Sequence, residues 1–111
     1  TAIMVSNHGG RQLDGSRAPF DQLAEICDAV GDKLDVICDG GVQRGSHVLK
    51  ALSVGAKACS GGRLYLYALA AAGEAGVDRI VTRLRLEIER DMKLMGVKSV
   101  NELSRANLRW R

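Results

Sequence analysis

The chain has 111 residues, of which 46% are hydrophobic, and a formal net charge of +3. This size suits one domain with a single core, and no apolar run approaches the roughly 20 residues that span a bilayer. Aromatic residues make up only 4% of the chain, so it lacks the dense basic stripe with interleaved aromatics that is typical of nucleic-acid binding. We expect a globular protein without a nucleic-acid partner.

The first 31 residues predict a strand, a loop and a helix. The apolar run after Thr1 predicts a strand over residues 2–6, followed by a loop to Ala18. Pro19 suits the first turn of a helix, and Gly31 is a typical stop. Apolar side chains between them recur at helical spacing; they are Phe20, Leu23, Ile26, Cys27 and Val30.

The pattern repeats twice more. Strands are expected over residues 34–38 and 56–60, separated by a helix that Ser46 caps and Gly55 ends. A helix over residues 64–72 follows, then a longer one after Gly76 that Gly96 closes. One face of the longer helix is apolar; its members are Val77, Ile80, Val81, Leu84, Ile88, Met92 and Met95. Ser99 and Glu102 have capping-box spacing and predict a last short helix.

Strands that alternate with helices predict a parallel sheet with right-handed crossovers. Each strand is nearly all apolar, which is typical of strands covered on both faces. Three strands alone leave two sheet edges unpaired. We therefore expect a piece of a larger α/β protein, or pairing with another chain.

Three cysteines, Cys27, Cys38 and Cys59, include no Cys-x-x-Cys pair. The odd number and the spacing argue against a disulfide framework and a structural zinc site. We expect Cys38 and Cys59 to pack as small hydrophobes and the protein to lie in a reducing compartment, cytoplasmic or peripheral to a membrane. No metal site is predicted.

The segment Ser6-Asn7-His8-Gly9-Gly10-Arg11-Gln12-Leu13-Asp14 follows the first strand. His8 can accept a proton near neutral pH, and Arg11 can hold a carboxylate through two parallel hydrogen bonds. Both stand after the carboxyl end of a strand, where α/β proteins keep their chemistry. The alternative is a glycine loop with ordinary hydrogen bonds.

Two further glycine-rich turns connect strands to helices. Asp39-Gly40-Gly41-Val42-Gln43-Arg44 follows the second strand, and Gly61-Gly62-Arg63 follows the third. Backbone N–H groups at such turns, together with the helix dipole, can cradle an anion. The spacing is not Gly-x-Gly-x-x-Gly, so a Rossmann dinucleotide site is not supported. A bound phosphate would account for both turns, whereas plain tight turns are the alternative.

Taken together, these motifs resemble the FMN-dependent 2-hydroxy-acid oxidases and dehydrogenases over essentially the whole chain. The further matching segments are Lys50-Ala51-Leu52, Gly55-Ala56 and Gly73-Glu74-Ala75-Gly76-Val77. The resemblance implies that residues 1–111 are the C-terminal part of such an enzyme. They would form the last three βα units of a (β/α)8 TIM barrel, plus C-terminal helices.

The resemblance also implies roles. His8 matches the base that takes the substrate hydroxyl proton, and Arg11 matches the arginine that binds the substrate carboxylate. The turn Asp39–Arg44, including Gly40, Gly41, Val42 and Gln43, matches residues along the ribityl chain and phosphate of FMN. Gly62 and Arg63 match the phosphate-binding pair. The implied partners are a small 2-hydroxy acid, an acceptor (quinone, cytochrome or oxygen), and further copies in a homo-oligomer, a tetramer in the family.

The chain departs from the family pattern at two places. Gln43 replaces a usual arginine, so a positive charge at the phosphate is lost unless Arg44 supplies it. Cys59, Ser60 and Gly61 replace bulky aliphatic residues of the third strand, which should weaken its packing. Two other readings remain open at this point: a non-catalytic FMN- or phosphate-binding module, and a fragment that self-associates through its strand edges.

Overall fold

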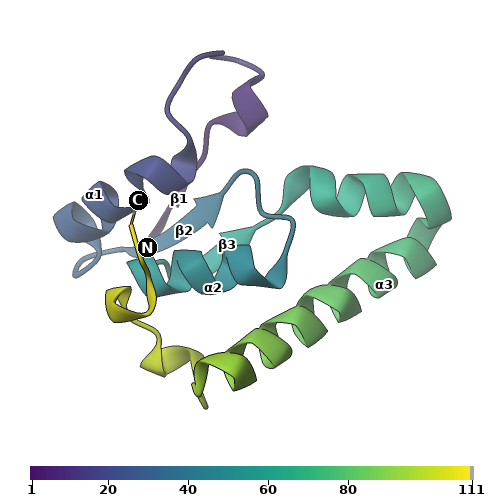
Figure 1. Cartoon of the computed structure of the whole chain (residues 1–111). Coiled ribbons are helices and arrows are strands. Elements are labelled where there is room, and N and C mark those ends of the chain that lie inside the picture. Colours follow the sequence, from purple (N-terminus) through teal and green to yellow (C-terminus); the bar gives the residue numbers. More distant parts are fainter. Residues whose placement is uncertain (111) are drawn as a thin grey trace.

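Three parallel strands lie side by side in the order β1-β2-β3 (Figure 1). A computed structural model describes residues 1–110 and gives β1 as Ala2–Val5, β2 as Asp35–Asp39 and β3 as Ala58–Ser60. Val5 pairs with Cys38, and Cys38 pairs with Cys59. The predicted parallel order is confirmed, with boundaries that differ by one or two residues, and the carboxyl ends of all three strands meet at one edge.

Two helices cover one face of this sheet. They are α1, Pro19–Val30, and α2, Gly45–Val54, and both begin and end within one residue of the predicted signals. The cap predicted at Ser46 is wrong, because α2 begins one residue earlier, with Arg44 as the N-cap residue and no side-chain cap. The core between helices and sheet is apolar; its buried members are Val5, Leu23, Val36, Cys38, Ala51, Val54 and Ala56. Alternate strand residues point the other way, and Met4 on that side is 54% exposed. Residues 1–110 therefore cover one face of the sheet, not both as the apolar strands predicted.

The long helix α3, Gly62–Met95, consists of two arms that meet at a sharp bend. Ala72 and Gly73 leave helical geometry there, and Gly73 has φ +59°, a left-handed conformation that glycine adopts without penalty. The first arm leads away from the sheet and the second returns beside α2 (Figure 1). The break between two predicted helices is confirmed.

The predicted apolar face of the second arm is only partly buried. Leu84, Ile88 and Met92 are half-buried, whereas Val81 is 58% and Met95 40% exposed. Neither lies deep in the contact with α2, because that helix is much shorter than the arm.

The tail after α3 forms two 3-10 turns, Val100–Glu102 and Arg105–Asn107. The predicted cap is present in a shifted form, because Ser99 Oγ accepts the N–H of Asn101 while the Glu102 carboxylate accepts that of Lys98. The second turn was not predicted. Trp110 ends the described chain by stacking on Phe20 of α1, with ring centroids 6.3 Å apart.

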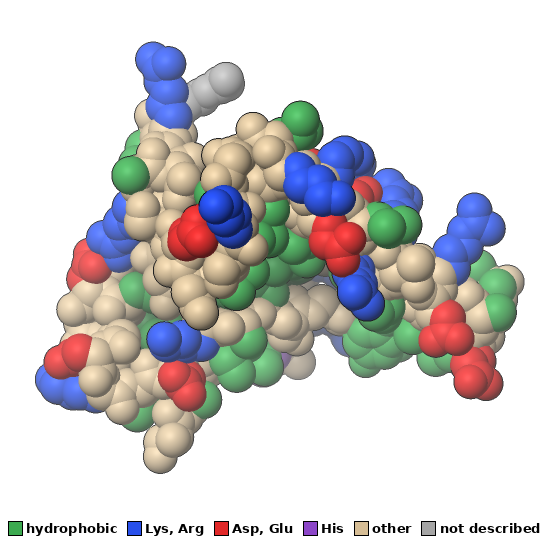
Figure 2. Space-filling model, turned by 90° about the horizontal axis from the view of Figure 1, so that it is seen from below, with side chains coloured by type: hydrophobic (Ala, Val, Ile, Leu, Met, Phe, Trp, Pro, Cys, Tyr) green, Lys and Arg blue, Asp and Glu red, His purple; other side chains and the backbone are tan. Residues whose placement is uncertain are grey.

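Charges of both signs are mixed over the face seen in Figure 2, with hydrophobic side chains between them. No single-sign stripe forms on this face. None of the helices within residues 1–110 combines the length and the apolarity needed to cross a membrane.

Candidate functional site

A cavity of about 580 Å³ lies at the edge where the three strands end. Loops after parallel strands converge at this edge, so residues far apart in the sequence meet there. The cavity is lined by every site residue predicted from the sequence except Arg44: His8, Arg11, Asp39, Gly40, Gly41, Val42, Gln43, Gly62 and Arg63. Its other lining residues are Gly9, Gln12, Leu64 and Leu66.

The turn that carries His8 is fixed to the end of β2. Ser6 Oγ accepts the backbone N–H of His8 at 3.1 Å and donates to Oδ2 of Asp39 at 2.5 Å. Asn7 Oδ1 accepts the N–H of Gly9 at 3.0 Å. His8 itself has φ +52°, a conformation that is uncommon outside glycine and concentrates at functional sites. Local hydrogen bonds thus hold the imidazole in a strained, exposed position at the cavity.

Arg63 lies directly against this turn. A Cβ built on Gly9 would come within 2.8 Å of Arg63 Nη2 and 3.3 Å of its Cζ. Glycine leaves the guanidinium in this position, whereas a methyl group would push this flexible side-chain end aside. The absence of a side chain at Gly9 therefore lets Arg63 lie against the loop after β1, and two arginines, Arg11 and Arg63, line one cavity.

The N-terminus of α2 already binds an anionic side chain of the protein itself, the carboxylate of Glu87. Glu87, on the second arm of α3, is 6% exposed and accepts the N–H of Gly45 at 2.8 Å. Its carboxylate also pairs with Arg44 and Arg83, each at 3.0 Å. The Gly45 N–H and the two guanidinium groups outweigh burial and lower the pKa of Glu87 to about 2.

Sequence reasoning missed Glu87 and assigned Arg44 to the cofactor. The structure holds the Arg44 side chain on Glu87 instead, and Arg44 does not line the cavity. A signal was available, because Glu87 follows Arg83 at helical i,i+4 spacing and lies between Leu84 and Ile88 of the apolar face.

The loop between β2 and α2 is held by His47. Its Nδ1 lies 3.3 Å from the backbone N of Gln43 and 3.2 Å from the carbonyl oxygen of Gly41. His47 is half-buried, in the first turn of α2. The side chain of Gln43 remains exposed beside the cavity.

The cavity suits a phosphate at the start of α3. A Cβ at Gly62 would meet nothing within 4 Å, and the same holds at Gly41, so both backbones are open to a ligand. Within residues 1–110 neither Arg11 nor Arg63 has an ion pair. The only acidic residue that lines this cavity is Asp39, whose carboxylate accepts a hydrogen bond from the Ser6 hydroxyl. Two cations and the free N–H groups of a helix start form a typical anion site.

Known proteins match the chain closely. L-lactate dehydrogenase (cytochrome) of Saccharomyces cerevisiae is 50% identical over 108 residues, which cover 93% of this chain and 18% of that protein. Pre-mycofactocin synthase of Mycobacterium tuberculosis is 46% identical over 108 residues, covering 97% of this chain and 27% of its own length. The chain thus spans less than a third of each of these relatives.

The fold matches solved structures equally well. The structure of a soluble mutant of the membrane-associated (S)-mandelate dehydrogenase from Pseudomonas putida superposes with a TM-score of 0.92 at 42% identity, covering 97% of this chain and 30% of that one. The family model described as FMN-dependent dehydrogenase matches residues 1–110. The chain therefore belongs to the FMN-dependent dehydrogenase family.

Proposed function

We propose that this chain carries the base and the phosphate-binding part of an FMN-dependent enzyme that oxidises an L-2-hydroxy acid to the 2-oxo acid. It would form the last three βα units of a (β/α)8 barrel and its C-terminal helices. His8 accepts the proton of the substrate hydroxyl, because a neutral imidazole is the one side chain here suited to that task near pH 7. Arg11 binds the substrate carboxylate through its planar guanidinium.

Other residues of the cavity hold the cofactor. Gly62 and Arg63 bind the phosphate of FMN with the backbone N–H groups that open α3 and with one guanidinium. Asp39, Gly40 and Gly41 lie along the ribityl chain, followed by Val42 and Gln43. When bound, FMN supplies a two-electron acceptor for the hydrogen at C2 of the substrate. The Arg44 side chain keeps the start of α2 in place through Glu87 and does not contact the phosphate.

The observation that carries this proposal is that His8, Arg11, Gly62 and Arg63 line one cavity. A proton acceptor, a carboxylate site and a phosphate site within reach of each other are what this reaction requires. Membership of the FMN-dependent dehydrogenase family favours this reading over a non-catalytic binding module. The electron acceptor is oxygen, a quinone or a cytochrome, and the working unit is a homo-oligomer in a reducing, cytoplasmic or membrane-peripheral setting.

The proposal can be tested in a chimera, because the chain matches a defined segment of the yeast relative. That segment is replaced by this chain, and the flavin absorbance is followed anaerobically after addition of L-lactate, glycolate or L-mandelate. We expect retained flavin and bleaching by one of these acids. His8→Gln should retain the flavin but slow its bleaching about 10²- to 10⁴-fold.

His47 provides the matched control, since the chain has two histidines. His47→Gln removes the ring that contacts Gly41 and Gln43, so it should weaken flavin retention but leave the bleaching rate of the flavin that stays bound within about threefold of the parent chimera, because His47 does not line the cavity that holds His8. A chimera without flavin would contradict the phosphate site. Retained flavin that none of the acids bleaches would contradict the substrate class, and an unimpaired His8→Gln chimera would contradict the role of the base.

A further inference from the structure

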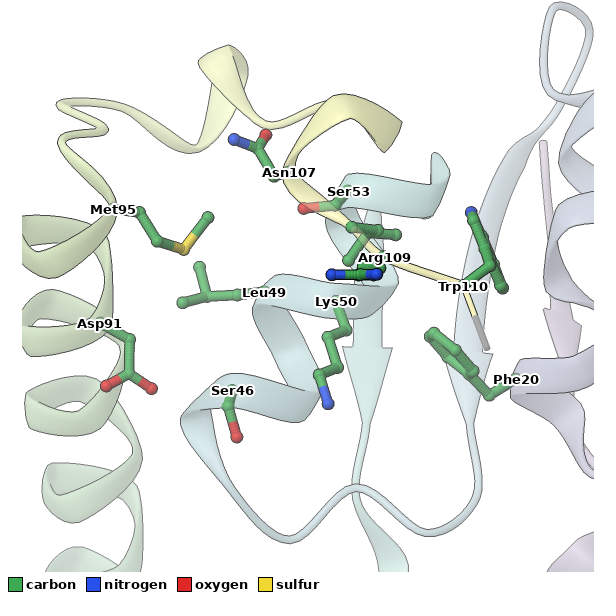
Figure 3. Close-up of a pocket in the computed structure, with 11 residues that line it drawn as sticks. Phe20, Ser46, Leu49, Lys50, Ser53, Asp91, Met95, Asn107, Arg109 and Trp110 are labelled. Atoms are coloured by element: carbon green, nitrogen blue, oxygen red, sulfur yellow. The ribbon is translucent and has the colours of Figure 1, made fainter.

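A second cavity, of about 340 Å³, lies away from the strand ends, between α2, the end of α3 and the tail. Apolar side chains from four segments form most of its wall; they are Phe20, Leu49, Met95, Leu108 and Trp110. Met95 and Leu49 point toward each other across it, and the Phe20–Trp110 stack stands on the other side of Lys50 and Arg109 (Figure 3). The size is at the lower end of small-molecule sites.

The polar groups of this cavity do not satisfy one another. Lys50 and Arg109 both line it, and neither has an ion pair within residues 1–110. Asp91 is the one acidic lining residue, and its Oδ1 already pairs with Arg90 at 2.8 Å. Two exposed cations therefore line this largely apolar space without a counter-ion in the described chain.

The hydroxyl of Ser53 is the second, independent observation. Ser53 is 3% exposed, and its Oγ has no hydrogen-bond partner among residues 1–110. Buried polar groups are nearly always paired, so an orphaned hydroxyl on a cavity wall indicates a missing acceptor. In Figure 3 the Arg109 guanidinium is drawn between the Ser53 hydroxyl and the Lys50 side chain, whose amine points away from Ser53. A carboxylate bound to Arg109 could accept from the Ser53 hydroxyl on one side, and the exposed Lys50 amine could turn toward it from the other.

From this arrangement we propose that the cavity is a binding site for a small carboxylic acid with an apolar body of about one ring. The carboxylate lies between Lys50 and Arg109 and accepts from the hydroxyl of Ser53. The apolar body fills the space between Leu49, Met95 and the Phe20–Trp110 stack. This site is separate from the proposed FMN cavity, with which it shares no lining residue.

Trp110 makes the test direct, because it is the only tryptophan of the chain and it lines the cavity. The 111-residue chain is titrated with 4-iodobenzoate, whose iodine quenches tryptophan fluorescence on contact. The matched neutral probe is 4-iodobenzyl alcohol. We expect saturable quenching by the acid and at least about tenfold weaker binding of the alcohol, because charge-assisted hydrogen bonds form only with the acid.

Two variants separate this site from nonspecific binding. Lys50→Gln should weaken 4-iodobenzoate binding about tenfold, whereas Lys33→Gln, which removes another exposed charge that does not line this cavity, should not. Ser53→Ala should weaken binding about threefold or more while raising the urea midpoint of the ligand-free chain, since it removes an unpaired buried hydroxyl. If the Ser53 hydroxyl had a purely structural role, Ser53→Ala would leave the affinity for 4-iodobenzoate unchanged.

Circular dichroism confirms that each variant is folded. Quenching that rises linearly without saturation would overturn the proposal. So would equal binding of acid and alcohol, or an affinity that neither Lys50→Gln nor Ser53→Ala changes.

Discussion

The carboxylate of Glu87 reaches across from α3 to the backbone N–H of Gly45 and fills the N-terminus of α2 from within the protein. Helix N-termini at glycine turns attract phosphate, and α2 and α3 both begin at such a turn, although only the start of α3 lines the cavity. Because Glu87 occupies the first, the second, at Gly62, is the one open to a ligand. This asymmetry explains why Gln43 can stand near the start of α2 without a positive charge, whereas Arg63 supplies one at α3.

Glu87→Gln should lower the free energy of unfolding at pH 7 by about 1–3 kcal/mol, because it weakens charge-assisted bonds to a buried carboxylate. Its pKa is about 2 in the fold against an ordinary 4.5. The lowered pKa stabilises the fold above about pH 4.5, and this contribution is lost as pH falls toward 2. Urea titrations of both proteins from pH 7 to pH 3 should therefore converge at low pH. A gap that stays constant with pH would contradict the ion cluster.

Gly45→Ala should destabilise the fold, because a Cβ there would lie 2.6 Å from the Cβ of Glu87 and 2.7 Å from the backbone N of Ile88. Overpacking of this kind costs about 1–3 kcal/mol. Gly62→Ala is the matched substitution at the start of the other helix, where a Cβ meets nothing within 4 Å. Thermal unfolding should show a clearly lower midpoint temperature for Gly45→Ala and almost no change for Gly62→Ala. Equal decreases would refute the close contact between α2 and α3.

Gly9→Ala should weaken FMN binding to the chain about tenfold, because the new methyl group would displace the Arg63 guanidinium. Gly15→Ala controls for backbone strain. Gly15 has a positive φ of +80°, close to the +68° of Gly9, but a Cβ at Gly15 would meet nothing within 4 Å. Both variants should lose similar stability, and flavin fluorescence quenching should show an affinity loss for Gly9→Ala alone. Parallel affinity losses would mean that Arg63 does not depend on this approach.

Cys59 should resist alkylation in the folded chain. Burial raises the pKa of its thiol to about 12, and only the thiolate reacts. Iodoacetamide at pH 8, followed by peptide mass analysis, should modify Cys59 about 100-fold more slowly in the native protein than in urea. Equal rates would show that β3 opens readily, as its small residues at Cys59, Ser60 and Gly61 could permit.

Local signals predicted the backbone well. Pro19, Gly55 and Gly96 mark helix ends through preferences of their own φ angles, so these boundaries can be inferred without knowing the rest of the fold. The same holds for the convergence of the site loops, because parallel strands bring successive loops to one edge. His8 and Arg63, 55 positions apart in the printed sequence, could therefore be assigned to one site in advance.

Long-range pairing was not predictable in the same way. The partner of Gly45 is 42 positions away, and which residue of α3 meets it depends on the bend at Gly73 and on the rotation of the second arm. The exposure of Met4 was missed because a nearly all-apolar strand predicts cover on both faces of the sheet, while residues 1–110 cover only one. The assignment of Arg44 to the cofactor failed to anticipate a competing carboxylate inside the protein.

The contact between Gly45 and Glu87 also has a consequence for the order of folding. The sheet and α2 end by residue 60, yet the start of α2 gains its capping carboxylate only when the second arm of α3 returns. Closing a loop of this length is slower than forming a local turn. The strands and α1 can therefore form their contacts first, and the start of α2 is fixed only once Glu87 has joined the fold.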